Sequence, residues 1–234
     1  MRRTGVGSWG RGFGSFVSVV VLTAITATGL TGCQLGRFQK RPAPAYPEVQ
    51  WRDHPPTNEL ESNLWVAAAR RSLEAQAVAR NVTDFSIPEL VRTTGRDLRS
   101  RTYKSTLEFV RQNKHVEIYP GPRPFLPLKV ESNFRGDENR AEVFGCLASE
   151  WGSREGTVPA ASHAYGTSFR MERLSDGQMR ITATVGQPNL NDDCATSDVP
   201  VALFNPAPEP SDVTDSQYIE GAGRADIDPL EKIS

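Results

Sequence analysis

Apolar and polar positions recur with two different periods along this chain. Between residues 58 and 114 the apolar side chains return every three to four positions, which is typical of amphipathic helices. The segment NELESNLWVAAARRSLEAQAVARN is rich in alanine, the best helix former, and Leu64 and Leu73 lie on its apolar stripe. Asn58 with Glu61 matches a capping box, so we predict a helix that begins at residue 58.

Two more helices follow from the same period. In SIPEL, Ser86 matches a helix cap, and Pro88 is tolerated in the first turn. Gly95 then interrupts the pattern. The segment DLRSRTYKSTLEFVRQNK resumes it, with Tyr103 and Val110 at helical spacing.

Beyond Lys114 the period becomes two, which indicates half-buried strands. Four segments show it: LKVESNF, AEVFGCLASEW, TSFRMERL and QMRITATV. Asp176-Gly177 between the last two predicts a hairpin turn, because both residue types tolerate positive φ. PGPRPFLP is rich in proline, which lacks a backbone donor, so we predict a loop or an edge there. Helices followed by antiparallel strands indicate an α+β fold with the N-terminal helices on one face of the sheet.

The first residues resemble a targeting segment. Arg2, Arg3 and Arg11 precede the apolar run FVSVVVLTAITATGL, whose 15 residues are fewer than the about 20 that a membrane-spanning helix needs. A positive start, a short apolar run and small residues describe a secretory signal peptide. Arg2-Arg3 leaves twin-arginine export as the alternative to the general secretory route.

The apolar run ends in Leu30, Thr31, Gly32 and Cys33, and this LTGC sequence resembles the bacterial lipobox. The resemblance implies that a diacylglycerol is attached to the Cys33 sulfur and that the signal peptide is cut just before it. Acyl chains contribute about 0.8 kcal/mol per buried CH₂, so two chains anchor a protein stably. An ordinary cleaved secretion signal is the alternative.

These patterns divide the chain into four segments. We expect a signal peptide over 1–32, a proline-rich stalk over 33–57, an α+β domain over 58–200 and an acidic disordered tail over 201–234.

The order of elements resembles a known superfamily. Helices precede a meander that contains RAEVFGCLASEW and ends in LSDGQMRIT followed by a cysteine. This is similar to actinobacterial lipoproteins with a nuclear-transport-factor-like domain, a cone-shaped, cystatin-like α+β fold that ketosteroid isomerases share. The resemblance covers residues 58–196. It implies a curved antiparallel sheet of four to five strands wrapped on the helices, with room for a pocket in the cone.

Charge excludes one class of partner. The chain has 27 basic and 28 acidic residues, whereas a nucleic-acid-binding protein would show a basic excess, so no nucleic acid is expected. Residues 64–114 are nevertheless basic and residues 205–234 acidic. Either these are a solvated helix face and a free tail, or the basic surface faces anionic lipid headgroups or wall polymers.

Cysteine usage predicts one covalent link. Outside the cytoplasm the remaining pair, Cys146 and Cys194, is expected to form a disulfide. A thiol-exchange or metal pair is the alternative, although no Cys-x-x-Cys spacing supports it.

Metal and cofactor motifs are weak in this sequence. His54, His115 and His163 are scattered, and the oxygen-rich segment from Asn189 to Cys194 lacks the alternation of a calcium loop and indicates a polar turn. No serine nucleophile elbow, phosphate-binding loop or dinucleotide glycine set is present, so we expect no metal and no cofactor.

The superfamily resemblance implies acid–base candidates in the cone, namely Tyr103, His115 and Glu131. The local pattern favours a core role for Tyr103 and solvent exposure for Glu131. We therefore expect a non-catalytic, lipid-anchored envelope protein on the extracytoplasmic face of the cell membrane that binds a partner protein, a wall polymer or a small apolar ligand. The alternatives are an isomerase-like or dehydratase-like enzyme and an accessory subunit of an envelope transport system.

Overall fold

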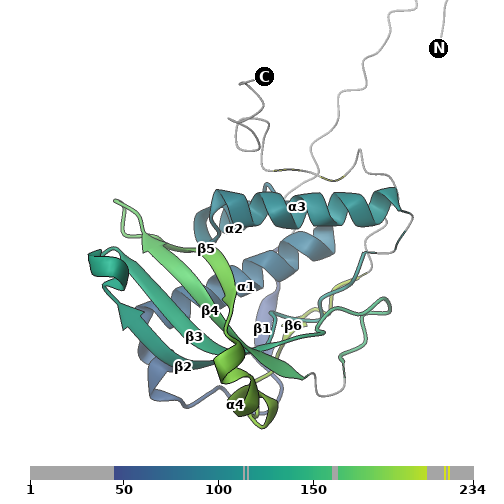
Figure 1. Cartoon of the computed structure of the whole chain (residues 1–234). Coiled ribbons are helices and arrows are strands. Elements are labelled where there is room, and N and C mark those ends of the chain that lie inside the picture. Colours follow the sequence, from purple (N-terminus) through teal and green to yellow (C-terminus); the bar gives the residue numbers. More distant parts are fainter. Residues whose placement is uncertain are drawn as a thin grey trace, which may run out of the picture. The chain divides into compact units, whose positions relative to one another are not determined.

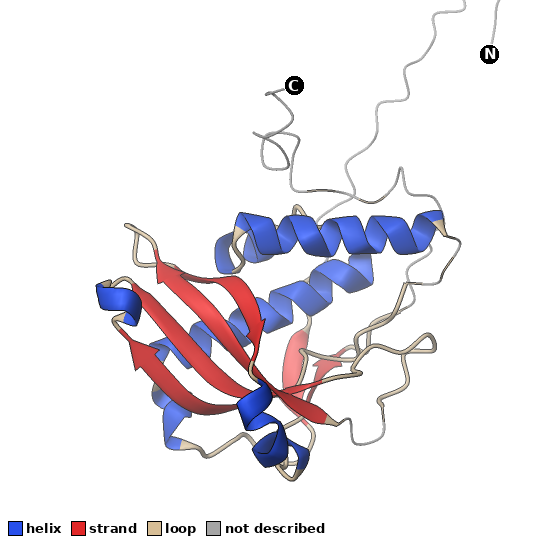
Figure 2. Ribbon diagram, in the orientation of Figure 1, coloured by secondary structure: helices blue, strands red, loops and turns tan. Residues whose placement is uncertain are grey.

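The computed structural model describes residues 45–112, 114, 116–159, 163–209, 219 and 221. Four strands form its main sheet, in the order β2-β3-β4-β5 with every pair antiparallel. Their bounds are Phe125–Ser132 for β2, Arg140–Ala148 for β3, Ala164–Arg173 for β4 and Met179–Gly186 for β5. Figures 1 and 2 show α1 crossing one face of this sheet, as the sequence predicted for an α+β fold.

Among the described residues, three α-helices precede the main sheet and a short one follows it. Their bounds are Leu64–Val82 for α1, Pro88–Thr93 for α2, Arg96–Arg111 for α3 and Asn191–Ala195 for α4. The helices α1, α2 and α3 contact β5, while α4 lies against β3 and β4. The sequence predicted a polar turn where α4 lies, and the structure instead has this short helix preceded by the 3-10 turn Pro188–Leu190.

The helix starts differ from the predicted ones. Asn58 does cap, but it caps the 3-10 turn Glu59–Ser62 by accepting from the Leu60 N–H. Asn63 caps α1, with its side chain accepting from the Trp65 N–H, so the helix begins six residues later than predicted. Leu64 is 66% exposed and is not part of the apolar stripe, because it occupies the first position after the cap.

The start of α2 also differs. Its cap position is Ile87, with no side-chain cap, whereas Ser86 uses both its hydroxyl and its backbone N–H to bond the carboxylate of Asp84. Pro88 opens the helix as predicted, and Gly95 precedes α3 and donates its N–H to the Ile181 carbonyl, 2.7 Å away.

Turns and bulges shape the sheet. In the β4–β5 turn Gly177 has φ +82°, a backbone conformation that residues with a side chain rarely adopt. The Leu174 N–H donates to the Gln178 carbonyl across this turn. The register shifts between Pro127 and Lys129 on the edge strand β2, and bulges of this kind bend a sheet. The proline-rich segment thus runs into an edge strand, as the sequence predicted.

Helix α1 divides the core in two. Its first half packs Trp65, Val66 and Leu73 against the sheet. Its second half packs Ala77 and Val78 into a separate cluster with α2, α3 and the segments that follow them. Because α1 is buried on more than one side, small alanines suit it better than a single stripe of large side chains would.

Two of the predicted segment boundaries are wrong. Strand β1, Glu48–Trp51, lies in the predicted stalk, and β6, Ala202–Asn205, lies in the predicted tail; the two pair antiparallel as a second sheet. Ile219 is also buried, in the same cluster as Phe204. The folded part therefore extends beyond residues 58–200 at both ends. Residues 1–44 and most of 210–234 lie outside the described residues.

Candidate functional site

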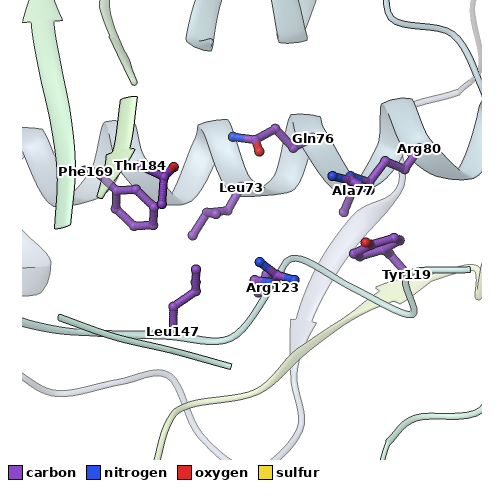
Figure 3. A pocket seen from close by; sticks show the side chains of 9 residues that line it. All are labelled: Leu73, Gln76, Ala77, Arg80, Tyr119, Arg123, Leu147, Phe169 and Thr184. Carbon is purple, nitrogen blue, oxygen red and sulfur yellow. The ribbon is translucent and has the colours of Figure 1, made fainter. Parts of the chain in front are cut away.

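A cavity of about 60 Å³ lies between α1 and the sheet. Figure 3 shows the side chains that line it: Leu73, Gln76, Ala77 and Arg80 from α1, Leu147 from β3, Phe169 from β4, Thr184 from β5, and Tyr119 and Arg123 from the segment between α3 and β2. One side of the wall is apolar and the other carries two guanidinium groups. The described residues of this wall include no carboxylate and no histidine.

Arg123 projects from a segment that prolines and hydrogen bonds hold in place. Pro122 and Pro124 flank it, and the Trp151 indole N–H donates to the Gly121 carbonyl at 2.8 Å. Its Nη2 donates to the Ser149 carbonyl at 3.2 Å. Its Nε is buried and has no hydrogen-bond partner among the described residues. A buried donor without an acceptor costs about 1–3 kcal/mol, so Arg123 is held in this place at a cost in stability.

Arg80 enters the cavity from the last turn of α1, where a cation suits the negative end of the helix dipole. Its guanidinium lies over the Tyr119 ring, 5.1 Å from the centroid. The Tyr119 backbone is held by Asn81, whose side-chain amide donates to the Tyr119 carbonyl and accepts from its N–H, both at 2.8 Å. The two arginines are therefore positioned by separate backbone segments.

A second pocket, of about 150 Å³, shares Leu73 and Arg123 with the first. Its apolar wall consists of Val49, Trp51, Pro122, Pro124, Pro200 and Ala202. Its charged wall consists of Arg70, Arg71, Arg123 and Glu74. We call the first space the inner cavity and the second the outer pocket.

Trp51 and Arg70 contact each other on the wall of the outer pocket. The Arg70 guanidinium lies 5.2 Å from the centre of the Trp51 ring, and its Nε donates to the Glu61 carboxylate at 2.7 Å. Trp51 therefore docks on the domain through β1, although the sequence placed it in a stalk. The charge of Arg70 is already matched by Glu61.

Glu74 is the acid on the wall of the outer pocket. Burial, and secondarily the charge of Glu89, raises the pKa of Glu74 to about 7, while Arg71 acts in the opposite direction. Burial also raises the pKa of the Tyr46 hydroxyl, and the charges of Glu74 and Glu89 raise it further. Glu74 is thus only partly ionised near neutral pH, and the outer pocket is net positive.

Of the acid–base candidates named from the superfamily, Tyr103 and Glu131 do not line either pocket. Tyr103 packs edge-on against Phe85, with ring centroids 5.9 Å apart. Glu131 lies on the edge strand and pairs with Lys129 at 2.6 Å, partly exposed. His115 lies outside the described residues. Sequence reasoning missed Arg80 and Arg123; the signal for Arg123 was an arginine set between two prolines in PGPRPFLP.

Cys146 and Cys194 form a disulfide, with their Cα atoms 5.2 Å apart. The bond joins β3 to α4, and both residues are buried. Beside it, the Asn191 side chain accepts from the Gly166 N–H at 2.9 Å, so α4 is tied to the sheet by a covalent and a polar contact. Cys33 lies outside the described residues.

Other candidates remain apart. His54 and His163 are exposed, and within the described ranges no group of three or more His, Cys, Asp or Glu side chains could hold a metal ion. None of the described helices is both long enough and apolar enough to cross a membrane.

Comparison with known proteins finds no family model, no curated protein and no solved structure that matches this chain.

Proposed function

We propose that this protein is an extracytoplasmic lipoprotein of the cell envelope, anchored in the cell membrane by acyl chains on Cys33, whose α+β domain binds a ligand rather than catalysing a reaction. The observation that carries the proposal is how the three cysteines are used. Two of them form the Cys146–Cys194 disulfide, and such bonds persist in oxidising compartments. The third stands in the lipobox-like LTGC sequence directly after a short apolar run.

The shape and chemistry of the inner cavity support binding. Its polar side chains include two arginines, which remain protonated at any physiological pH and therefore hold anions better than they transfer protons. General acid–base catalysis needs a group that titrates near the working pH, such as histidine or a carboxylate. The described wall of the inner cavity has neither, and the one carboxylate of the adjoining outer pocket's described wall is Glu74, whose pKa is about 7.

The superfamily resemblance is consistent with this proposal. A sheet that wraps helices leaves a space between the two layers, and the inner cavity lies there. Because one fold hosts many activities, the resemblance supports the architecture of a binding domain without naming its ligand.

The anchor is tested by labelling with a fatty-acid analogue in a bacterium that processes lipoproteins. We expect the native chain to incorporate the label and to gain the mass of a diacylglycerol on a chain that begins at Cys33. The Cys33→Ala variant should incorporate none. Gln34→Ala, one position further along, is the matched control and should be labelled like the native chain. Equal labelling of Cys33→Ala, or no labelling of the native chain, would refute the anchor.

The compartment is tested separately through the other two cysteines. Unfolding the exported protein with an alkylating reagent and no reductant should leave both Cys146 and Cys194 unmodified. Adding a reductant should make both reactive. Free thiols before reduction would contradict an oxidising location.

A further inference from the structure

The charged side chains around the two pockets are strongly biased toward one sign. Arginine contributes four of them, and the acids are Glu74 on the wall and Glu61 beside Arg70. The four are Arg70, Arg71, Arg80 and Arg123. Since Glu61 matches Arg70, the pockets keep a positive excess that an anion would complement.

Arg123 is the group that both pockets share. One of its Nη atoms is satisfied by Ser149, whereas its buried Nε has no acceptor in the described part of the chain. A guanidinium presents its donors in a planar fork that matches the two oxygens of a carboxylate. A carboxylate on Arg123 would complement its charge, and Arg80, which lies on the same side of the inner cavity, would add attraction.

The outer pocket offers room for an apolar group beside this charge. Its volume of about 150 Å³ is close to that of engineered apolar cavities that bind benzene. Trp51 and three prolines supply flat, rigid apolar surfaces on its wall. The inner cavity, at about 60 Å³, holds little more than a carboxylate-sized group.

We propose that these adjoining pockets bind a small amphipathic carboxylate, with its carboxylate on Arg123 and its apolar part against Trp51 and the prolines of the outer pocket. The proposal rests on the proposed function in treating the domain as a binding module, and it names the ligand class of that same site. It places no requirement on the lipid anchor.

The probe is phenylacetate, titrated calorimetrically into the full chain in detergent. Its neutral counterpart is 2-phenylethanol, which has the same ring and no charge, and inorganic phosphate is an anion with no apolar part. We expect phenylacetate to bind at least about tenfold more tightly than either. Equal affinities of phenylacetate and phenylethanol would overturn the role of charge, and equal affinities of phenylacetate and phosphate would overturn the apolar subsite.

Variants assign the two halves of the site. Arg123→Met keeps an unbranched apolar stem, removes the guanidinium and its charge, and should weaken phenylacetate about tenfold or more while leaving phenylethanol unchanged. Trp51→Ala should weaken both ligands. Arg154→Met is the matched control, because Arg154 is exposed and lines neither pocket; it should bind both like the native chain.

The Arg123→Lys variant tests whether weaker binding in Arg123→Met comes from the lost guanidinium or from misfolding. This variant keeps the positive charge without the fork, and we expect affinity for phenylacetate between those of the native chain and Arg123→Met. Unchanged phenylacetate binding in Arg123→Met, or no binding by the native chain at millimolar concentration, refutes the proposal. Neither result would affect the labelling of Cys33, so failure of this ligand class and failure of the anchor are distinguishable.

Discussion

The side chain of Asn81 pairs with the backbone of Tyr119 as a neighbouring strand would, donating to its carbonyl and accepting from its N–H. Both bonds measure 2.8 Å, and Asn81 is buried near the end of α1. This contact joins α1 to the irregular segment that carries Arg123. The wall of the inner cavity therefore depends on a side chain that does not line it.

Asn81→Ala should destabilise the fold by about 2–3 kcal/mol, because it leaves a buried backbone donor and acceptor without partners. Urea denaturation followed by circular dichroism measures the loss. Asn139→Ala, at an exposed position, is the control and should change stability by less than about 0.5 kcal/mol. An equal effect of the two substitutions would show that the Tyr119 backbone finds other partners.

Replacing Cys146 and Cys194 together by alanine should reduce the free energy of unfolding by about 4 kcal/mol. The disulfide closes a loop of 48 residues, and the chain-entropy relation gives this value for a loop of that length. The urea midpoints of the native and double-alanine chains, both unreduced, measure the difference. Indistinguishable midpoints would mean that α4 contributes nothing through its covalent link.

Glu74→Gln should flatten the dependence of stability on pH. The pKa of Glu74 is about 7 in the folded chain and near 4.5 when unfolded, so between these values the folded chain binds more protons and stability falls as pH rises. Because Glu74 is partly exposed, we expect a loss of only about 1–2 kcal/mol from pH 4.5 to pH 8 in the native chain.

Thermal unfolding at a series of pH values between 4.5 and 8 measures this effect. The Glu74→Gln chain should be more stable than the native chain above pH 7 and similar below pH 4.5. Glu155→Gln, at an exposed position, is the control and should keep the native slope. A Glu74→Gln chain that keeps the full native slope would assign the pH dependence to other groups.

Gly121→Ala should destabilise the fold by about 3 kcal/mol or more. A Cβ at this position would lie 2.0 Å from the Ala202 carbonyl oxygen, so β6 would have to move away. The Phe204 N–H donates to the Pro120 carbonyl at 2.8 Å, and this bond would be strained with it. Gly186→Ala is the matched control, since a Cβ there meets nothing within 4 Å and it should change stability little.

Calorimetric melting of the two glycine variants compares these expectations. If Gly121→Ala melts like Gly186→Ala, then β6 yields at little cost and is not an integral part of the domain.

The sequence by itself determined the parts that depend on neighbours along the chain. The alanine-rich helix, the strands of period two and the turn at Gly177 follow from side-chain spacing and from which residues tolerate positive φ. The Cys146–Cys194 disulfide was predicted because an oxidising location was expected and because two cysteines remain once Cys33 is set aside. Periodicity did not locate the start of α1, because Asn58 and Asn63 are both good caps and only packing selects between them.

Only the tertiary structure decided what distant segments do together. The strands β1 and β6 are four residues each, too short to show a period, and they form because each supplies the other's backbone partners across more than 150 positions. Arg80 and Arg123 carry no motif, and they line the same cavity because the backbone around Tyr119 is bonded to α1. Local propensity is additive along a sequence, whereas a binding site depends on contacts whose partners the sequence does not name.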